Sequence, residues 1–119
     1  MALHIEEKSL DQVTLLELRG RVVLGDGTSR LQEKVQALLG EGRNRIAMDM
    51  AEVNYIDSSG LATLISCSRG ARNKGGDLKL VNPSKRVRDI LSITRLDAVL
   101  EAFDTFDLAQ ASFGAAPKA

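Results

Sequence analysis

The apolar residues of this 119-residue chain switch repeatedly between the spacing of a β-strand and the spacing of an α-helix. Leu3 and Ile5 alternate with polar neighbours, and residues 13–18 are rich in β-forming side chains. These two segments predict a β-hairpin that ends near Gly20. A chain that begins with a hairpin and then alternates helical and strand-like spacing of its apolar residues can adopt only a small set of α/β folds.

A helical stripe follows the hairpin, formed by Leu31, Val35, Leu38 and Leu39. Its start is expected to be capped by Asp26, Thr28 or Ser29, and its end to fall at Gly40 or Gly42. The remaining expected strands are 45–50, 77–82 and a short edge strand within 99–103. The remaining expected helices run from about residue 58 to the Lys74-Gly75-Gly76 stop, from a cap at Ser84, and from Asp104 through about Ser112.

The predicted order is β-β-α-β-α-β-α-(β)-α, which implies a mixed sheet with helical crossovers. The length favours one domain, which we expect to span residues 1–113, with a flexible C-terminal tail at 114–119. No internal repeat divides the chain.

Composition excludes several classes of function. The 16 basic and 16 acidic residues cancel, so nucleic-acid binding has no overall electrostatic support. Cys67 is the only cysteine, which rules out an intrachain disulfide and argues against a cysteine-based zinc site. No apolar run approaches the roughly 20 residues that span a bilayer, and the first residues lack the pattern of a signal peptide. We therefore expect a cytoplasmic protein without membrane insertion, cofactor or metal.

The stretch "YIDSSGLATLI", residues 55–65, places two serines between an acid and a glycine at the start of an apolar helical stripe. A catalytic serine needs an activating base, most often histidine, and the only histidine is His4 on the first predicted strand. Ser58 also lacks the Gly-x-Ser-x-Gly context of the hydrolase fold. The sequence therefore predicts a protein that is not an enzyme.

Nucleotide and metal binding are weakly supported. The segment 70–75 has the first spacing of a phosphate loop, but it lies after a helix and lacks the Lys-Ser/Thr pair, so it is interpreted as a helix stop. Asp49, Glu52 and Asp57 are near one another in sequence without a recognised ligand spacing.

A structural role is the main alternative for the serines. Ser58 before an apolar stripe is typical of a helix N-cap, and Asp57 is an equally good cap, which leaves one polar residue to spare. Gly60 weakens the first turn and is expected where another group approaches the backbone closely. The residues alone leave capping and function open.

The segment "MDMAEVNYIDSSGLATLI" resembles the central motif of the STAS family, the anti-sigma factor antagonist domains of bacteria. "LRGRVVLGDGTSRLQEKV" and "GGDLKLVNPSKRVRDILSITRLDAVLEAF" resemble the family's strand-Gly-strand-Asp-helix segment and its usual ending. The similarity covers roughly residues 3–112. It implies an α/β fold with a mixed four- to five-stranded sheet and helices mainly on one face.

The resemblance also implies a partner-switching mechanism. Ser58 falls on the family's phosphorylated serine, and Ser59 is a secondary candidate. The implied partners are an anti-sigma factor that is also a serine kinase with a histidine-kinase-like ATPase fold, and a PP2C-like phosphatase. The residues expected to contact the partner are Asp26, Asp57, Ser58, Ser59, Gly60 and Leu61.

Several alternatives remain open at this stage. Asp26 matches an acid near the family's phosphosite, and helix capping explains it equally well. Arg69 and Arg72 are suited to contact an acidic partner or to sit at the negative end of a helix dipole. Single domains of this family also serve as adaptor subunits of lipid-transport ATPases and as parts of stress-signalling assemblies, so an adaptor is the alternative function.

Overall fold

The computed structural model describes residues 3–113, and the expectation of a flexible tail at 114–119 falls outside this range. The strands are β1 (His4–Leu10), β2 (Val13–Val22), β3 (Arg45–Ile56), β4 (Asp77–Val81) and β5 (Ala102–Phe103). The helices are α1 (Asp26–Gly40), α2 (Ser58–Asn73), α3 (Lys85–Ile93) and α4 (Phe106–Phe113), with a 3-10 helix at Leu96–Ala98. This order confirms the predicted alternation.

The strands form one five-stranded mixed sheet in the order β1-β2-β3-β4-β5. β1 and β2 are the predicted hairpin and run antiparallel, whereas β2 to β5 are parallel neighbours. Parallel neighbours need a crossover connection, and α1, α2 and α3 lie in the three connections. The fold class predicted from the sequence is confirmed.

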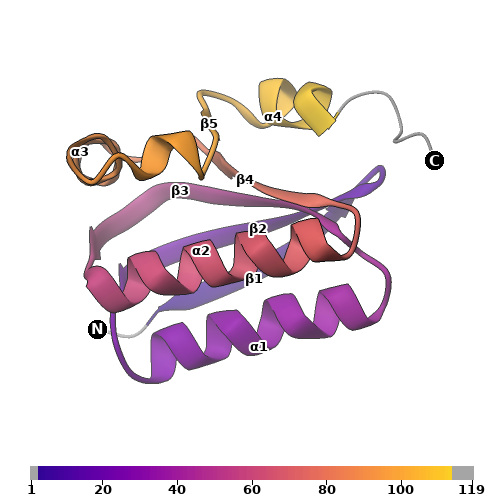
Figure 1. Cartoon of the computed structure of the whole chain (residues 1–119), viewed down its shortest axis with the longest axis horizontal. Coiled ribbons are helices and arrows are strands. Elements are labelled where there is room, and N and C mark those ends of the chain that lie inside the picture. The colour runs from indigo at the N-terminus through magenta and orange to yellow at the C-terminus, as the bar shows by residue number, and fades with distance from the viewer. Residues whose placement is uncertain (1–2, 114–119) are drawn as a thin grey trace.

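The core lies between the sheet and three of the helices (Figure 1). Leu16 and Leu18 of β2 point into this core, while Val13 and Leu15 point to the opposite face, as the period of a strand requires. The core helices contribute residues such as Leu31 of α1, Leu64 of α2 and Val87 of α3. On the opposite face α4 and three half-buried phenylalanines cover a smaller cluster, so helices lie mainly on one face, as expected.

Two strands differ in length from the prediction. β3 continues beyond residue 50 to Ile56, although only Val53 and Ile56 are buried in that extension. The extension pairs with β2, and the register of this pairing shifts twice. The extension is therefore a strand because of its backbone pairing and not because of alternating apolar side chains. β5 is reduced to two residues because residues 99–101 turn and bend after the 3-10 helix instead of extending the strand.

The capping expectations are partly correct. Ser84 caps α3, and its hydroxyl accepts a hydrogen bond from the Val87 amide at 3.4 Å. α1 is preceded instead by Gly25, at φ 122°, with no side-chain cap, so capping by Asp26, Thr28 or Ser29 was wrong. A backbone conformation that only glycine adopts easily replaces the side-chain cap there. α4 begins at Phe106 rather than Asp104, with the Thr105 hydroxyl accepting from the Leu108 amide.

Candidate functional site

The conspicuous acid-serine-serine-glycine motif lies where β3 ends and α2 begins. Figure 1 shows that the N-termini of α1 and α2 lie at the same end of the molecule. In a sheet with parallel strands this is the carboxyl edge, where the loops after β2 and β3 lie next to each other. The fold therefore brings residues 23–26 beside residues 57–61.

Asp57 connects these two loops. One oxygen of its carboxylate, Oδ1, accepts a hydrogen bond from the Gly60 amide at 2.7 Å, which makes Asp57 the N-cap of α2. The other, Oδ2, accepts from the Leu24 amide at 3.1 Å. These backbone amides, first that of Gly60 and then that of Leu24, lower the pKa of Asp57 below its ordinary value. We call this pair of hydrogen bonds the Asp57 bridge.

Gly60 is explained by the approach of β2. A Cβ atom at this position would lie 2.1 Å from the Val22 carbonyl oxygen and 2.7 Å from the Ile56 Cγ1 atom. The Val22 carbonyl also accepts the Asp57 amide at 3.2 Å. The group that approaches the Gly60 backbone is therefore the end of the chain's own strand β2.

The two serines do not cap α2. Ser58 is the first residue of the helix and its side chain is exposed, with no hydrogen bond to its hydroxyl within residues 3–113. Ser59 is half-buried, and its carbonyl accepts the Thr63 hydroxyl at 2.9 Å. Because Asp57 already serves as the cap, the capping alternative for Ser58 was wrong, and its hydroxyl faces solvent at a helix N-terminus.

The other expected partner-binding residues are placed differently. Asp26 is exposed in the first turn of α1, where its carboxylate pairs with Arg30 at 2.9 Å. It follows the loop that the Asp57 bridge holds. Gly60 and Leu61 are buried, so they position the start of α2 within the fold and present almost no side-chain surface.

Leu24 is the feature that the sequence interpretation missed. This side chain is 76% exposed, although it follows two valines in the sequence. Its amide is held by the Asp57 bridge, so the loop places a large apolar side chain on the surface at the same end as Ser58. The run Val22-Val23-Leu24 before Gly25-Asp26 was the available signal, because three apolar residues in succession cannot all face one side of a strand.

The remaining candidates have structural settings. His4 is exposed on the edge strand β1, and β2 lies between β1 and the strand that leads to Ser58. Arg72 donates to Asp77 at 3.0 Å and to the Val99 carbonyl at 2.7 Å, which fits the helix-end interpretation. Arg69 is exposed. Within residues 3–113 no group of three metal-ligating side chains is assembled, and no described helix is long and apolar enough to cross a membrane.

The protein is a small α/β domain with a mixed five-stranded sheet. Its distinctive motif lies at the N-terminus of α2, where an exposed serine follows an acidic cap. The family model described as "Mlab, STAS domain" matches residues 5–101 of the chain. The chain therefore belongs to the STAS domain family, and the predicted resemblance is confirmed.

Three members of this family are similar to the chain in sequence or structure. A candidate anti-sigma factor antagonist from Thermotoga neapolitana is 36% identical over 67 residues, which cover 56% of this chain and 59% of the relative. The anti-sigma-B factor antagonist of Bacillus subtilis is 31% identical over 71 residues, covering 60% and 64%. The crystal structure of the candidate antagonist tm1081 from Thermotoga maritima superimposes with a TM-score of 0.85 at 25% identity, covering 92% and 93%. The alignment to these two curated relatives thus spans about three-fifths of their length.

Proposed function

We propose that this protein is an anti-sigma factor antagonist whose binding to its partner is controlled by phosphorylation of Ser58. In this proposal the unmodified protein binds an anti-sigma factor, which is also the serine kinase, and thereby frees the sigma factor in the bacterial cytoplasm. The kinase has a histidine-kinase-like ATPase fold, and a PP2C-like phosphatase removes the phosphate. Residues 1–113 act as the single domain of this switch.

The observation that supports the proposal is that Asp57 caps α2 while the Ser58 hydroxyl stays exposed. Asp57 caps α2 by accepting a hydrogen bond from the Gly60 amide, so Ser58 is not needed as the cap. Its hydroxyl is exposed at the first position of the helix and is open to a kinase. Ser59 is half-buried, which makes it the secondary acceptor.

The electrostatic effect of phosphorylation follows from this position. A phosphate adds about −1.5 to −2 charges at pH 7, and free amides at a helix N-terminus are suited to hold it, so the fold need not change. Asp57 carries a negative charge at pH 7, and the hydrogen bonds to its carboxylate lower its pKa below the ordinary value. A partner surface fitted to a neutral hydroxyl would meet two adjacent anions, and a loss of about 3–4 kcal/mol weakens binding several hundredfold.

The other residues of the site have distinct roles in this proposal. Leu24 supplies exposed apolar area at the same end of the molecule as Ser58, of the kind that partners bury in the centre of an interface. Asp26 adds an exposed acid in the first turn of α1, two residues after Leu24. Gly60 and Leu61 act from within the fold, because they fix the start of α2 against β2.

The test begins with recovery of the tagged full chain from its native cells, followed by identification of bound proteins and mapping of phosphorylated residues by mass spectrometry. The affinity of the recovered partner for Ser58→Ala and Ser58→Asp is then measured. We expect Ser58→Ala to bind as well as the native protein and Ser58→Asp to bind at least about a hundredfold more weakly.

Ser66→Asp is the matched control, because Ser66 is also exposed on α2 but lies two turns further along the helix. It adds the same charge and should change the affinity little. Equal affinities for Ser58→Ala and Ser58→Asp contradict the charge-based switch.

A constitutive adaptor is the second candidate, because the matching family model is described by the name Mlab rather than as an antagonist. The same recovery experiment separates the two functions. Recovery of transporter ATPase subunits with an unmodified Ser58 under several growth conditions supports the adaptor. Recovery of an ATPase of the histidine-kinase type with phosphate on Ser58 supports the switch.

A further inference from the structure

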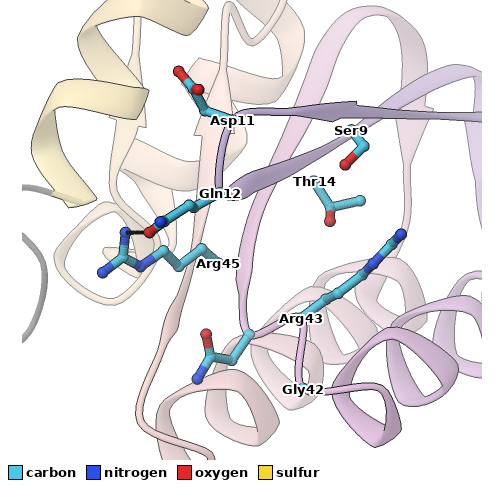
Figure 2. A pocket seen from close by; sticks show the side chains of 8 residues that line it. Ser9, Asp11, Gln12, Thr14, Gly42, Arg43 and Arg45 are labelled. Atoms are coloured by element: carbon cyan, nitrogen blue, oxygen red, sulfur yellow. Dashed lines mark hydrogen bonds between the residues drawn. The ribbon is translucent and has the colours of Figure 1, made fainter.

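A surface hollow of about 380 Å³ lies between the turn of the β1–β2 hairpin and the connection from α1 to β3 (Figure 2). The cations that line it are engaged within the chain. Arg45 donates to the Gln12 Oε1 atom at 3.2 Å, and Arg43 pairs with Glu7 at 2.7 Å and with Glu41 at 3.5 Å. An unpaired cation lies instead at the opposite end of the sheet, where β2 and β3 end.

β2 and β3 end with an exposed pair of side chains, Arg21 and Tyr55. After Gly20 the register between these strands shifts, and the shift passes over Asn54 and aligns Arg21 with Tyr55. The central carbon of the Arg21 guanidinium lies over the Tyr55 ring, 5.2 Å from its centre, which is a cation–π contact. Tyr55 stands three residues before Ser58, so the pair belongs to the same end of the molecule as the serine.

The Arg21–Tyr55 pair lies on the face of the sheet that carries α4. Val22 and Ile56, the next residues of the two strands, are buried in the core, and successive side chains of a strand point to opposite faces. The cluster beneath α4 uses residues near the starts of β2 and β3. The pair at the ends of these strands is therefore left uncovered.

Arg21 has no counter-charge on this surface. Within residues 3–113 its guanidinium forms no ion pair, and its partner is the Tyr55 ring. The acids of the neighbouring loops are engaged, since Asp26 pairs with Arg30 and Asp57 accepts backbone amides. Contact with a ring leaves N–H groups free, and a guanidinium binds a carboxylate through two such groups. The charge that complements Arg21 must therefore come from a binding partner.

Leu24 adds an apolar side chain at the same end of the sheet. It is 76% exposed, and its backbone amide is held by Asp57 at 3.1 Å. Gly25, at φ 122°, then turns the chain into α1. A side chain on a loop with a fixed backbone loses little conformational entropy when a partner buries it. The ends of β2 and β3 thus combine a positioned apolar side chain with an unpaired cation.

We propose that Arg21, Leu24 and Tyr55 form a docking surface for a partner protein that presents a carboxylate group to Arg21 and an apolar depression to Leu24. The proposal rests on the proposed function in one respect, because it places the partner at the end of the molecule that carries Ser58. It goes beyond that function by assigning the partner an acidic surface and by adding Arg21 and Tyr55, which lie on the far face of the sheet from α2.

The test uses the full chain with an unmodified Ser58 and the partner protein recovered from the native cells, expressed and purified separately. The affinities of Arg21→Gln and Leu24→Ala are measured by isothermal titration calorimetry at low and high concentrations of sodium chloride. We expect each variant to bind about tenfold more weakly, because a charge-assisted pair or a buried apolar contact is lost. The affinity of Arg21→Gln should depend less on salt than that of the native protein, whereas Leu24→Ala should keep the native salt dependence.

Two matched controls change the same residue types elsewhere. Arg69→Gln removes an exposed arginine about three turns beyond Ser58 on α2. Leu108→Ala truncates a leucine that is 54% exposed on α4. Both controls should bind as tightly as the native protein. Far-UV circular dichroism of all four variants should match the native protein, because each altered side chain is exposed.

The same affinity for Arg21→Gln and Leu24→Ala as for their controls overturns the docking surface. Tighter binding of Arg21→Gln identifies a basic partner surface and overturns the acidic assignment. A native salt dependence of Arg21→Gln overturns the carboxylate contact. Failure of the switch is seen separately, as equal affinities for Ser58→Ala and Ser58→Asp, and it leaves the comparison of Arg21→Gln and Leu24→Ala with their controls intact.

Discussion

Replacement of Gly60 by alanine tests how α2 is fixed to the sheet. The new Cβ atom would lie 2.1 Å from the Val22 carbonyl oxygen, which is more than about 1 Å shorter than an ordinary non-bonded contact. The obstructing atom belongs to the backbone of β2 and cannot rotate away as a flexible side chain would. The start of α2 must therefore move away from β2, which disturbs the Asp57 bridge.

Two effects of opposite sign determine the change in the free energy of unfolding. Overpacking against a rigid neighbour costs about 3 kcal/mol, whereas alanine is favoured over glycine within a helix by about 1 kcal/mol. The steric term is the larger, so Gly60→Ala should destabilise the protein by about 2 kcal/mol. This corresponds to a decrease in the melting temperature of roughly 10 °C for a domain of this size.

The assay is urea and thermal unfolding followed by far-UV circular dichroism. Gly40→Ala is the matched control, because Gly40 is the last residue of α1 and a Cβ atom there meets nothing within 4 Å. It should stabilise the protein by about 0.5 kcal/mol through the same helix preference. A Gly60→Ala variant as stable as the native protein would refute the close packing of α2 on β2.

Two further predictions concern titratable groups. Because the pKa of Asp57 is lowered in the folded state, its stabilising effect is present above the ordinary carboxyl pKa of about 3.8 and is lost as the pH falls through the lowered value. Asp57→Asn should therefore be less stable than the native protein at pH near 7, measured by urea unfolding, and this difference should shrink in acid; a difference independent of pH would contradict it. Burial raises the pKa of the Cys67 thiol to about 12, so a thiol reagent at neutral pH should label unfolded protein about a hundredfold faster than folded protein. Rapid labelling of the folded protein would disagree with this burial.

Local patterns were sufficient for most of the fold. The hairpin follows from alternation in residues 3–18, and the end of α2 follows from Gly75, whose φ of 85° suits glycine. Pro83 and Ser84 mark the boundary between β4 and α3 for similar reasons. The second half of β3 was not predictable in this way, because its exposed residues carry no apolar alternation and its pairing with β2 is irregular.

For the candidate site as well, the local sequence determined some features and the tertiary structure determined others. The sequence alone determined that an acid, two serines and a glycine stand at the start of a helix, because capping and helix preferences act over three or four residues. Only the tertiary structure decided which of them caps the helix, since the choice of Asp57 depends on a second hydrogen bond to Leu24, 33 residues earlier. That freed the hydroxyl of Ser58.

The role of Gly60 likewise comes from the packing of separate segments. Gly60 is required by the end of β2, because the Val22 carbonyl oxygen lies where a Cβ atom at residue 60 would stand. Contacts of this kind arise only when the crossover helices pack onto the sheet and set the distances between loops. The spacing of residues within one segment determines its local structure but not these distances, so the sequence predicted the elements and the tertiary structure decided which of their side chains are free to act.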